Sequence, residues 1–196
     1  MTAIGIAWNI RSDALAWPLT FEKKVEIFYE RTLGWQLHIA DLLINGGQPL
    51  GTTDTLVPIR HSGFAVLHIC LSYFETIGHY QKGYDGKKAF KAGVQSVFPQ
   101  LSTSYGADAD ELLDRLYSGA RCGLYHNSMT VPGLGLGQPT SGEAMEYDPT
   151  TKRLAISPER LPRVLEAHLE QFREKLLDPS NLELRKKFEW RFDQDN

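Results

Sequence analysis

An arginine and a histidine five positions apart are the residues of this chain best suited by type to act on a phosphate group. Arg121 and His126 enclose the residues Cys-Gly-Leu-Tyr. A guanidinium group binds two phosphate oxygens through its planar fork, and an imidazole ring exchanges a proton near neutral pH. Residues five positions apart on an ideal α-helix point about 140° away from each other. The two side chains therefore converge only if the helix ends or unwinds between them, which Gly123 makes possible.

The same two residues also have a purely structural explanation. A histidine near the end of a helix interacts favourably with the helix dipole, and an arginine on a helix surface pairs with a neighbouring carboxylate. The spacing of Arg121 and His126 does not distinguish this role from phosphate binding. Both interpretations are consistent with the sequence.

A line of polar residues marks one face of a helix that is otherwise apolar almost all round. The steps along the line are four, three and four, and its members are His68, Ser72, Glu75 and His79. Such a line faces solvent, a partner or a site. It is either a hydrogen-bonded polar face or a face from which Glu75 pairs with Arg121 or orients His126.

The same line raises the question of a metal site. Glu75 and His79 are spaced like two ligands on one helix face, but a structural metal site needs four ligands. No local cluster of cysteine and histidine supplies the others. We therefore predict no metal and no other cofactor, and we keep metal-dependent hydrolysis through His68, Glu75 and His79 as an alternative.

A basic stretch begins at Lys82 and is the densest run of positive charge before the C-terminal region. Lys87, Lys88 and Lys91 of this stretch are the candidate RNA-binding residues, because cationic side chains contact phosphates. The alternative is an ordinary solvated helix face. The glycine-rich run 133–137 resembles a dinucleotide loop only superficially, because it follows no clear strand and precedes no helix.

Length and composition are those of one ordinary globular domain covering residues 1–196. The chain is 42% hydrophobic and carries a net charge of −3, which excludes wholesale disorder and a general positive field for nucleic acids or membranes. Its two cysteines, Cys70 and Cys122, indicate buried thiols in a reducing compartment. The apolar stretch 64–74 is too short to span a membrane, and the N-terminus does not resemble a secretory leader. We therefore expect a cytoplasmic protein without a membrane partner.

The first half of the chain predicts three helices. Thr20 caps a helix that continues to about residue 44, with apolar residues at alternating steps of four and three. A loop over 45–62 separates it from a second helix over 63–82. A third, basic helix covers 86–98. The first 19 residues are expected to be irregular and anchored by Trp8 and Trp17.

The second half combines helices with a hairpin. Asp108 and Glu111 form a capping-box-like start for a helix that ends near His126. A loop over 132–142 precedes a β-hairpin over 144–156, and a helix begins at Ser157-Pro158-Glu159 and ends at Asp178. The tail over 181–193 fits a helix better than a strand. The predicted fold class is mainly α, an antiparallel helical bundle with a small late β-hairpin.

Residues 116–127 resemble the motif helix of HEPN proteins (higher eukaryotes and prokaryotes nucleotide-binding), and the similarity extends over about 20–178. The family signature is an arginine, four to six residues, and then a histidine. The hairpin and the helix after it resemble a bacterial subgroup of unknown function. The resemblance implies a helical bundle that forms homodimers, in which the two motifs face each other across the interface. It also implies that the protein is a metal-independent endoribonuclease. Arg121 would then stabilise charge on the scissile phosphate, and His126 would be a general acid or base.

One residue departs from the family pattern. Active members often carry a polar residue directly after the arginine, whereas Cys122 and Gly123 follow here. Two hypotheses therefore remain: an RNA-cleaving or RNA-binding site made of Arg121, His126 and Glu75, or a non-enzymatic interaction module with an unknown protein partner. The first requires both motif side chains in one open cleft, and the second requires a buried, salt-bridged arginine.

Overall fold

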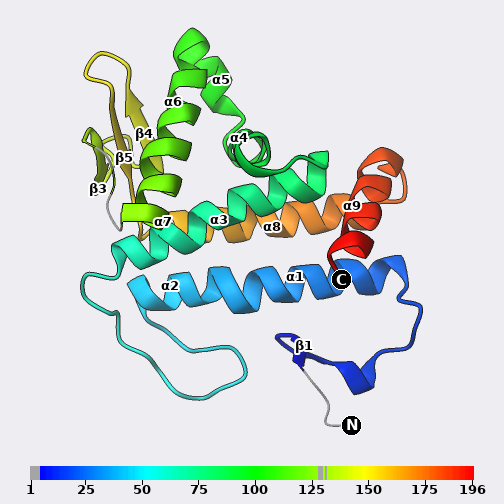
Figure 1. Cartoon of the computed structure of the whole chain (residues 1–196). Helices are drawn as coiled ribbons and strands as arrows, with labels where there is room; N and C mark the ends of the chain where they lie inside the picture. The colour runs from blue at the N-terminus through cyan, green and yellow to red at the C-terminus, as the bar shows by residue number, and fades with distance from the viewer. Residues whose placement is uncertain (1–4, 128–129, 131) are drawn as a thin grey trace.

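The computed structural model of the chain describes residues 5–127, 130 and 132–196, and it is mainly helical with two small sheets (Figure 1). The helices are α1 (Phe21–Thr32), α2 (His38–Asn45), α3 (Gly63–Lys82), α4 (Gly86–Val97), α5 (Gln100–Tyr105), α6 (Ala109–Arg115), α7 (Gly123–Asn127), α8 (Leu161–Leu177) and α9 (Leu182–Asp195). The strands are β1 (Gly5–Ala7), β2 (Ile10–Arg11), β3 (Leu134–Leu136), β4 (Met145–Asp148) and β5 (Arg153–Ile156). Among these residues no helix combines the length and the apolar character needed to cross a membrane.

The first long helix confirms the prediction for residues 20–44. The Thr20 hydroxyl accepts a hydrogen bond from the Lys23 backbone N–H at 3.2 Å and so caps α1. A π-helical segment, Leu33–Leu37, joins α1 to α2 without a break in the helix. The helix ends at Gly46, whose φ of 69° is a conformation that glycine adopts without strain.

Replacing Thr20 by alanine is expected to lower the free energy of unfolding by about 1 kcal/mol, because the Lys23 N–H then loses its acceptor. Thr20→Ser keeps the hydroxyl group and is expected to keep most of the stability. Urea unfolding followed by far-ultraviolet circular dichroism measures both variants. Equal losses in the two variants would contradict the capping role.

Helix α3 lies at the centre of the molecule and has the predicted bounds. Its buried side chains include Leu67, Tyr73, Phe74 and Ile77, and it contacts α2, α4, α8 and α9. Figure 1 shows α3 lying over the α1–α2 helix and running in the opposite direction. An apolar surface almost all round is what a central helix requires.

The crossing of α3 and α4 depends on two glycines. A Cβ atom added to Gly78 of α3 would lie 1.8 Å from the carbonyl oxygen of Ala89 in α4. A Cβ atom added to Gly93 of α4 would lie 1.8 Å from the carbonyl oxygen of Phe74 in α3. The two backbones therefore touch directly, and each helix contributes one glycine to the contact.

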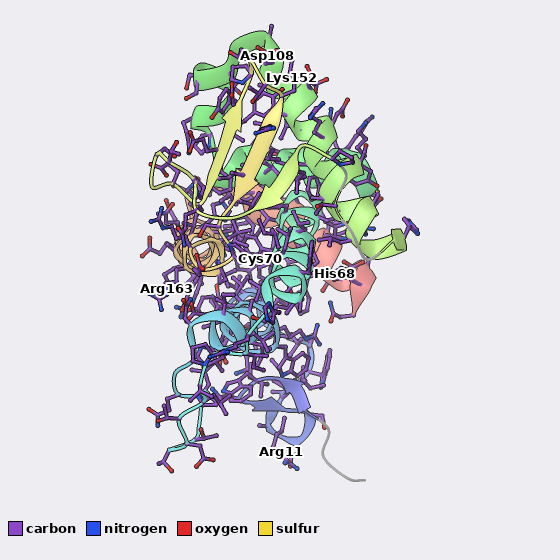
Figure 2. All side chains as sticks on the ribbon, turned by 90° about the vertical axis from the view of Figure 1, so that its left-hand side faces the viewer. Arg11, His68, Cys70, Asp108, Lys152 and Arg163 are labelled. Carbon is purple, nitrogen blue, oxygen red and sulfur yellow. The ribbon has the colours of Figure 1, made fainter. Side chains whose placement is uncertain are left out.

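The helix that carries Arg121 starts differently from the prediction. The Asp108 side chain makes no capping hydrogen bond to α6. It accepts instead from Lys152 Nζ at 2.9 Å, and Glu111 accepts from the same ammonium at 2.9 Å, so that the predicted capping box is wrong. Figure 2 shows Asp108 and Lys152 together where the hairpin meets the helix. The short helix α5 before this point was not predicted.

The hairpin is confirmed, and it belongs to a larger sheet than predicted. Strands β4 and β5 pair antiparallel, with Met145 opposite Ile156 and Asp148 opposite Arg153. Strand β3 lies inside the predicted loop 132–142 and pairs parallel with β5, Leu134 opposite Leu154. The strand order is β3-β5-β4. The loop prediction is therefore wrong for residues 134–136.

The last two helices pack against the core. Helix α8 begins at Leu161, later than predicted, because residues 158–160 form a turn in which the Ser157 carbonyl accepts from the N–H groups of Arg160 and Leu161. The prediction of a helical tail is confirmed by α9. Phe188 and Phe192 are buried, and a spacing of four residues places them on one side of a helix.

Three polar side chains connect α3, α4 and α8 inside the molecule. His168 of α8 is only 8% exposed. Its Nδ1 lies 2.8 Å from the Tyr73 hydroxyl of α3, and its Nε2 lies 2.9 Å from Ser96 Oγ of α4. Both ring nitrogens are therefore hydrogen-bonded, as a buried imidazole requires.

The N-terminal segment is less irregular than predicted, because β1 and β2 form a short antiparallel pair. Trp8 packs against Gly34 of the π-helical segment, where an added Cβ atom would lie 2.6 Å from the Trp8 Cβ. Trp17 is 70% exposed. The prediction of Trp17 as an anchor is therefore wrong, because its ring lies at the surface.

Candidate functional site

Arg121 is held in place by a carboxylate of the central helix. Its Nε and Nη2 atoms donate to Glu75 Oε2 of α3 at 3.2 Å and 3.0 Å. Both side chains are 28% exposed, so the ion pair lies at the edge of the molecule and not in its core. The pairing of Glu75 with Arg121, one of the alternatives that the sequence left open, is thus present in the structure.

The backbone around Arg121 is unusual. Residues Leu116–Cys122 form a π-helical segment between α6 and α7. A π-helical turn contains more residues than an α-helical turn, and such segments occur frequently at functional sites. The spacing of Arg121 and His126 brings their side chains together only if the helix ends or unwinds between them. The helix instead continues through α7.

A different histidine shares a cavity with Arg121. The cavity has a volume of about 80 Å³ and is lined by His68, Leu71, Ser72 and Arg121. His126 is exposed on α7 and does not line it. Figure 2 shows His68 on the outer side of α3. The sequence places His68 two helical turns before Glu75 on the same face, so the polar line was the signal for this arrangement.

The polar line continues into a second hollow on the same side of α3. This hollow has a volume of about 350 Å³ and is lined by Ser72, Glu75, Thr76, His79, Tyr80 and Asp195. Ser72 lines both spaces, and its hydroxyl donates to the Ile69 carbonyl at 2.7 Å. The polar line of α3 therefore borders two adjoining spaces. The first contains the positive charge of Arg121, and the second contains the carboxylates of Glu75 and Asp195.

His79 links three helices. Its Nδ1 lies 2.9 Å from Asp85 at the start of α4, and its Nε2 lies 2.9 Å from Asp195 of α9. Arg191 of α9 contacts both the imidazole ring and Asp85. In the part of the chain that the structure describes, no group of three or more histidine, cysteine, aspartate or glutamate side chains is arranged to hold a metal ion.

Tyr117 and Cys122 are the electrostatic neighbours of the Arg121 pair. Burial raises the pKa of the Tyr117 hydroxyl, and Cys122 and Glu75 raise it further, whereas Arg121 acts in the opposite direction. Cys122 is partly buried. Tyr117 therefore stays protonated at neutral pH, and the thiol that departs from the HEPN pattern belongs to this local group.

Two of the three candidate RNA-binding lysines are paired with carboxylates of α6. Lys87 Nζ lies 2.8 Å from Asp114, and Lys91 Nζ lies 2.7 Å from Asp110 and 2.5 Å from Asp114. Hydrogen bonds from Lys87 and Lys91 hold the pKa of the Asp114 carboxyl below its usual value. Lys88 is exposed. These pairs join α4 to α6 and neutralise Lys87 and Lys91, two of the four lysines of the basic stretch.

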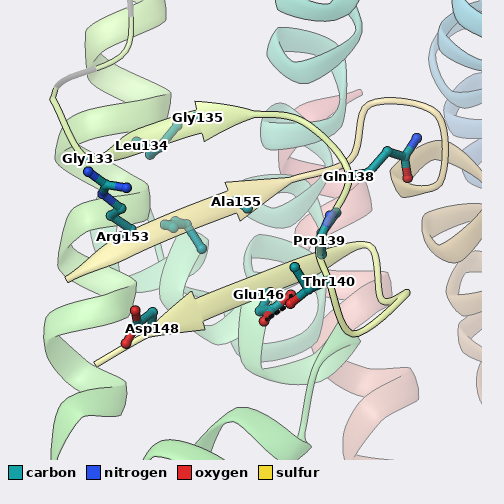
Figure 3. Close-up of a pocket in the computed structure, with 11 residues that line it drawn as sticks. Gly133, Leu134, Gly135, Gln138, Pro139, Thr140, Glu146, Asp148, Arg153 and Ala155 are labelled. Carbon is teal, nitrogen blue, oxygen red and sulfur yellow. Dashed lines mark hydrogen bonds between the residues drawn. The ribbon is translucent and has the colours of Figure 1, made fainter. Parts of the chain in front are cut away.

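The outer face of the three-stranded sheet carries a larger hollow, of about 550 Å³ (Figure 3). Gly135 and Ala155 line its floor, and Glu146, Asp148 and Arg153 lie around it. Both carboxylates are used locally. Glu146 accepts from Thr140 and Ser141, and Asp148 accepts from Thr150 and Thr151 in the hairpin turn. The two carboxylates at the border of this hollow therefore hold the neighbouring loop and the hairpin turn in place by hydrogen bonds.

Models of protein families, curated proteins and solved structures were each compared with the chain, and none of the three comparisons gives a match.

Proposed function

We propose that this protein is a metal-independent endoribonuclease of the HEPN type, a cytoplasmic helical bundle with its site at Arg121 and His126. Glu75 is the positioning residue for Arg121. His126 does not line the cavity at Arg121 of its own chain, so the open cleft that this function requires is formed only when a second copy of the chain brings its own His126 to Arg121. The observation that carries the proposal is the arginine fixed by two hydrogen bonds to one carboxylate oxygen. A guanidinium group that is already oriented stabilises developing charge without reorganisation.

The reaction follows from the chemistry of RNA. The 2′-oxygen attacks the adjacent phosphorus, the bond to the 5′-oxygen breaks, and the products are a 2′,3′-cyclic phosphate and a 5′-hydroxyl end. Arg121 neutralises the charge that builds up on the non-bridging oxygens. His126, exposed on α7, takes the proton of the 2′-hydroxyl or gives one to the leaving oxygen. Two subunits supply two histidines, so that one ring can act as base and the other as acid.

A cleavage assay on labelled RNA in excess EDTA tests the proposal. We expect cleavage by the wild type and a loss of roughly 10²- to 10⁴-fold in His126→Ala, the usual range for removing a general acid or base. Arg121→Lys keeps the charge but not the planar fork, so its rate should also fall. Substrate with 2′-deoxyribose at the cleaved position should stay intact, because the attacking oxygen is missing.

His61→Asn is the matched control. It removes an exposed histidine from the loop before α3, and asparagine tolerates the φ of 63° found there. Its cleavage rate should equal that of the wild type. Unchanged cleavage by a folded His126→Ala protein, or none by the folded wild-type protein, would contradict the proposal.

A second candidate function is a non-enzymatic module that binds a protein partner. The ion pairs favour it: Glu75 compensates Arg121, and Asp110 and Asp114 compensate Lys91 and Lys87. These pairs weaken the attraction for RNA phosphates. This candidate predicts that the folded wild-type protein cleaves no RNA and that sedimentation finds a stable dimer or complex.

A further inference from the structure

Helix α9 presents an indole ring and two lysines to solvent. The Trp190 side chain is 56% exposed, on the side of α9 opposite the buried Phe188. Lys186 and Lys187 lie one turn earlier, about 40° to one side of Trp190 and about 60° to the other on an α-helix. The Arg191 guanidinium lies 5.7 Å from the centre of the indole ring and attracts it. We call Lys186, Lys187 and Trp190 the outer face of α9.

Three carboxylates of α9 are compensated by groups of other helices. Lys24 of α1 donates to Glu189 and to Asp193 through Nζ, at 2.8 Å in each case. Asp195 lies 2.9 Å from Nε2 of His79 in α3. These carboxylates hold α9 on the core, and their charges are balanced there.

The lysines of the outer face are compensated far less. Lys186 lies 3.9 Å from Glu183, and the two side chains are 76% and 81% exposed, so that this ion pair is weak. Lys187 is exposed and makes no hydrogen bond or ion pair with the residues that the structure describes. Lys87 and Lys91 of α4, by contrast, are paired with carboxylates of α6. The outer face of α9 therefore keeps a positive charge that a polyanion can reach.

An exposed indole beside ammonium groups suits a single-stranded nucleic acid. Unpaired bases stack on aromatic side chains, because every base has a π-face, while cationic side chains next to the ring contact the phosphates. A duplex keeps its bases stacked inside and offers only its backbone and groove edges. Charge complementarity and the indole together therefore favour a strand with unpaired bases.

We propose that the outer face of α9 binds single-stranded RNA, with a base stacked on Trp190 and phosphates bound by Lys186 and Lys187. The inference rests on the proposed function in one respect, because it takes RNA as the substrate. It adds a substrate-binding surface outside the reacting centre. Helix α9 also borders the hollow that contains Glu75, and Glu75 holds Arg121, so the surface belongs to a helix that adjoins the proposed site.

Binding of a dye-labelled RNA oligomer to the full chain tests this surface. Its 2′-O-methyl groups prevent cleavage, and fluorescence anisotropy gives the affinity at several salt concentrations. We expect Trp190→Ala to lower the affinity about tenfold, as for the loss of one base stacked on an aromatic ring. Trp190→Phe keeps an aromatic ring and should keep most of the affinity. Lys187→Gln should reduce the slope of log affinity against log salt concentration by about 0.7.

Trp17→Ala is the matched control. The Trp17 side chain is 70% exposed, but the lysine that lines the same hollow, Lys24, is bound to Glu189 and Asp193. An exposed indole is therefore removed without an uncompensated lysine beside it. This variant should bind the oligomer like the wild type. Heparin, a polyanion without bases, should bind equally to the wild type and to Trp190→Ala.

Four results would overturn the proposal. The first is that the folded wild-type protein does not bind the oligomer, and the second is that Trp190→Ala binds it like the wild type. The third is a duplex of the same length that binds as tightly as the single strand, because charge alone then explains the affinity. The fourth is a dimer of the wild type that Trp190→Ala loses in sedimentation, because a second copy then covers this face.

The cleavage assay separates this inference from the proposed function. If Trp190→Ala weakens binding of the oligomer but the wild-type protein cleaves no RNA, the binding surface stands and the endoribonuclease fails. If the wild type and Trp190→Ala cleave subsaturating RNA at the same rate, the endoribonuclease stands and the binding surface fails.

Discussion

Gly93→Ala is expected to lower the free energy of unfolding by about 3 kcal/mol or more, at the upper end of the range for overpacked interiors. The new methyl group would lie 1.8 Å from the Phe74 carbonyl oxygen of α3. The obstacle is backbone, so no rotamer change relieves it, and the two helices must separate. In Gly78→Ala the new methyl group would lie 1.8 Å from the Ala89 carbonyl oxygen of α4. This variant should lose a similar amount of unfolding free energy. Such losses are a large part of the 5–15 kcal/mol that stabilises a typical domain.

Urea unfolding of both variants measures the effect. Gly137→Ala is the control, because nothing lies within 4 Å of its added Cβ atom and its φ is not in the left-handed region. It should leave the unfolding midpoint nearly unchanged. The double variant Gly78→Ala/Gly93→Ala should lose less than the sum of the two single losses, since one separation of α3 and α4 relieves both contacts. A Gly93→Ala protein that unfolds at the wild-type urea concentration would show that the crossing is looser than the structure indicates.

His168 is expected to make the folded protein sensitive to acid. Burial, with a smaller contribution from the positive charge of Lys175, lowers the pKa of His168 to about 4 from an ordinary value of 6.5. Between these two values the unfolded chain binds a proton that the folded chain does not. Stability from the neutral ring is therefore fully present above about pH 6.5, and it is lost as the pH falls toward 4. The loss is on the order of 3 kcal/mol at 1.36 kcal/mol per pH unit.

His168→Gln isolates this effect. Glutamine does not titrate but still offers hydrogen-bonding atoms to Tyr73 and Ser96, so the variant should start less stable at neutral pH and lose less on acidification. The difference between the two urea-unfolding curves, measured from neutral pH down to about 4, cancels the carboxylates that titrate in both proteins. His61→Asn should follow the wild type, because His61 is exposed. Parallel pH dependences for the wild type and His168→Gln would refute the assignment.

The sequence was sufficient for the helices that a repeating apolar pattern defines. Helix α3 has the predicted bounds because it is apolar almost all round and Gly83 follows it in a left-handed conformation. Asp108 failed as a cap because Lys152, distant in the sequence, binds its carboxylate. Strand β3 was missed because glycine and leucine alternate there with little intrinsic preference for a strand, and pairing with β5 decides its structure.

The candidate site was predicted in part. Of the interpretations left open for the polar line on α3, the structure contains the one in which Glu75 pairs with Arg121. The roles of His126 and the lysines remain predictions. The cavity that His68 and Arg121 line could not be predicted from the sequence, because its size depends on how closely α3 and the π-helical segment pack. The π-helical segment before Gly123 was equally out of reach, since its residues also suit an ordinary α-helix.

The distribution of indole rings decides how unfolding of this protein is best observed. Trp17, Trp35 and Trp190 are already 70%, 49% and 56% exposed in the folded state, and Trp8 is half-buried. Indole emission moves to longer wavelength when water replaces an apolar environment, so most of that shift has occurred before unfolding begins. Tryptophan fluorescence will therefore report little of the transition. The ultraviolet absorbance of the tyrosines is the better signal, because Tyr73 is fully buried beside His168 and reaches water only when the core unfolds.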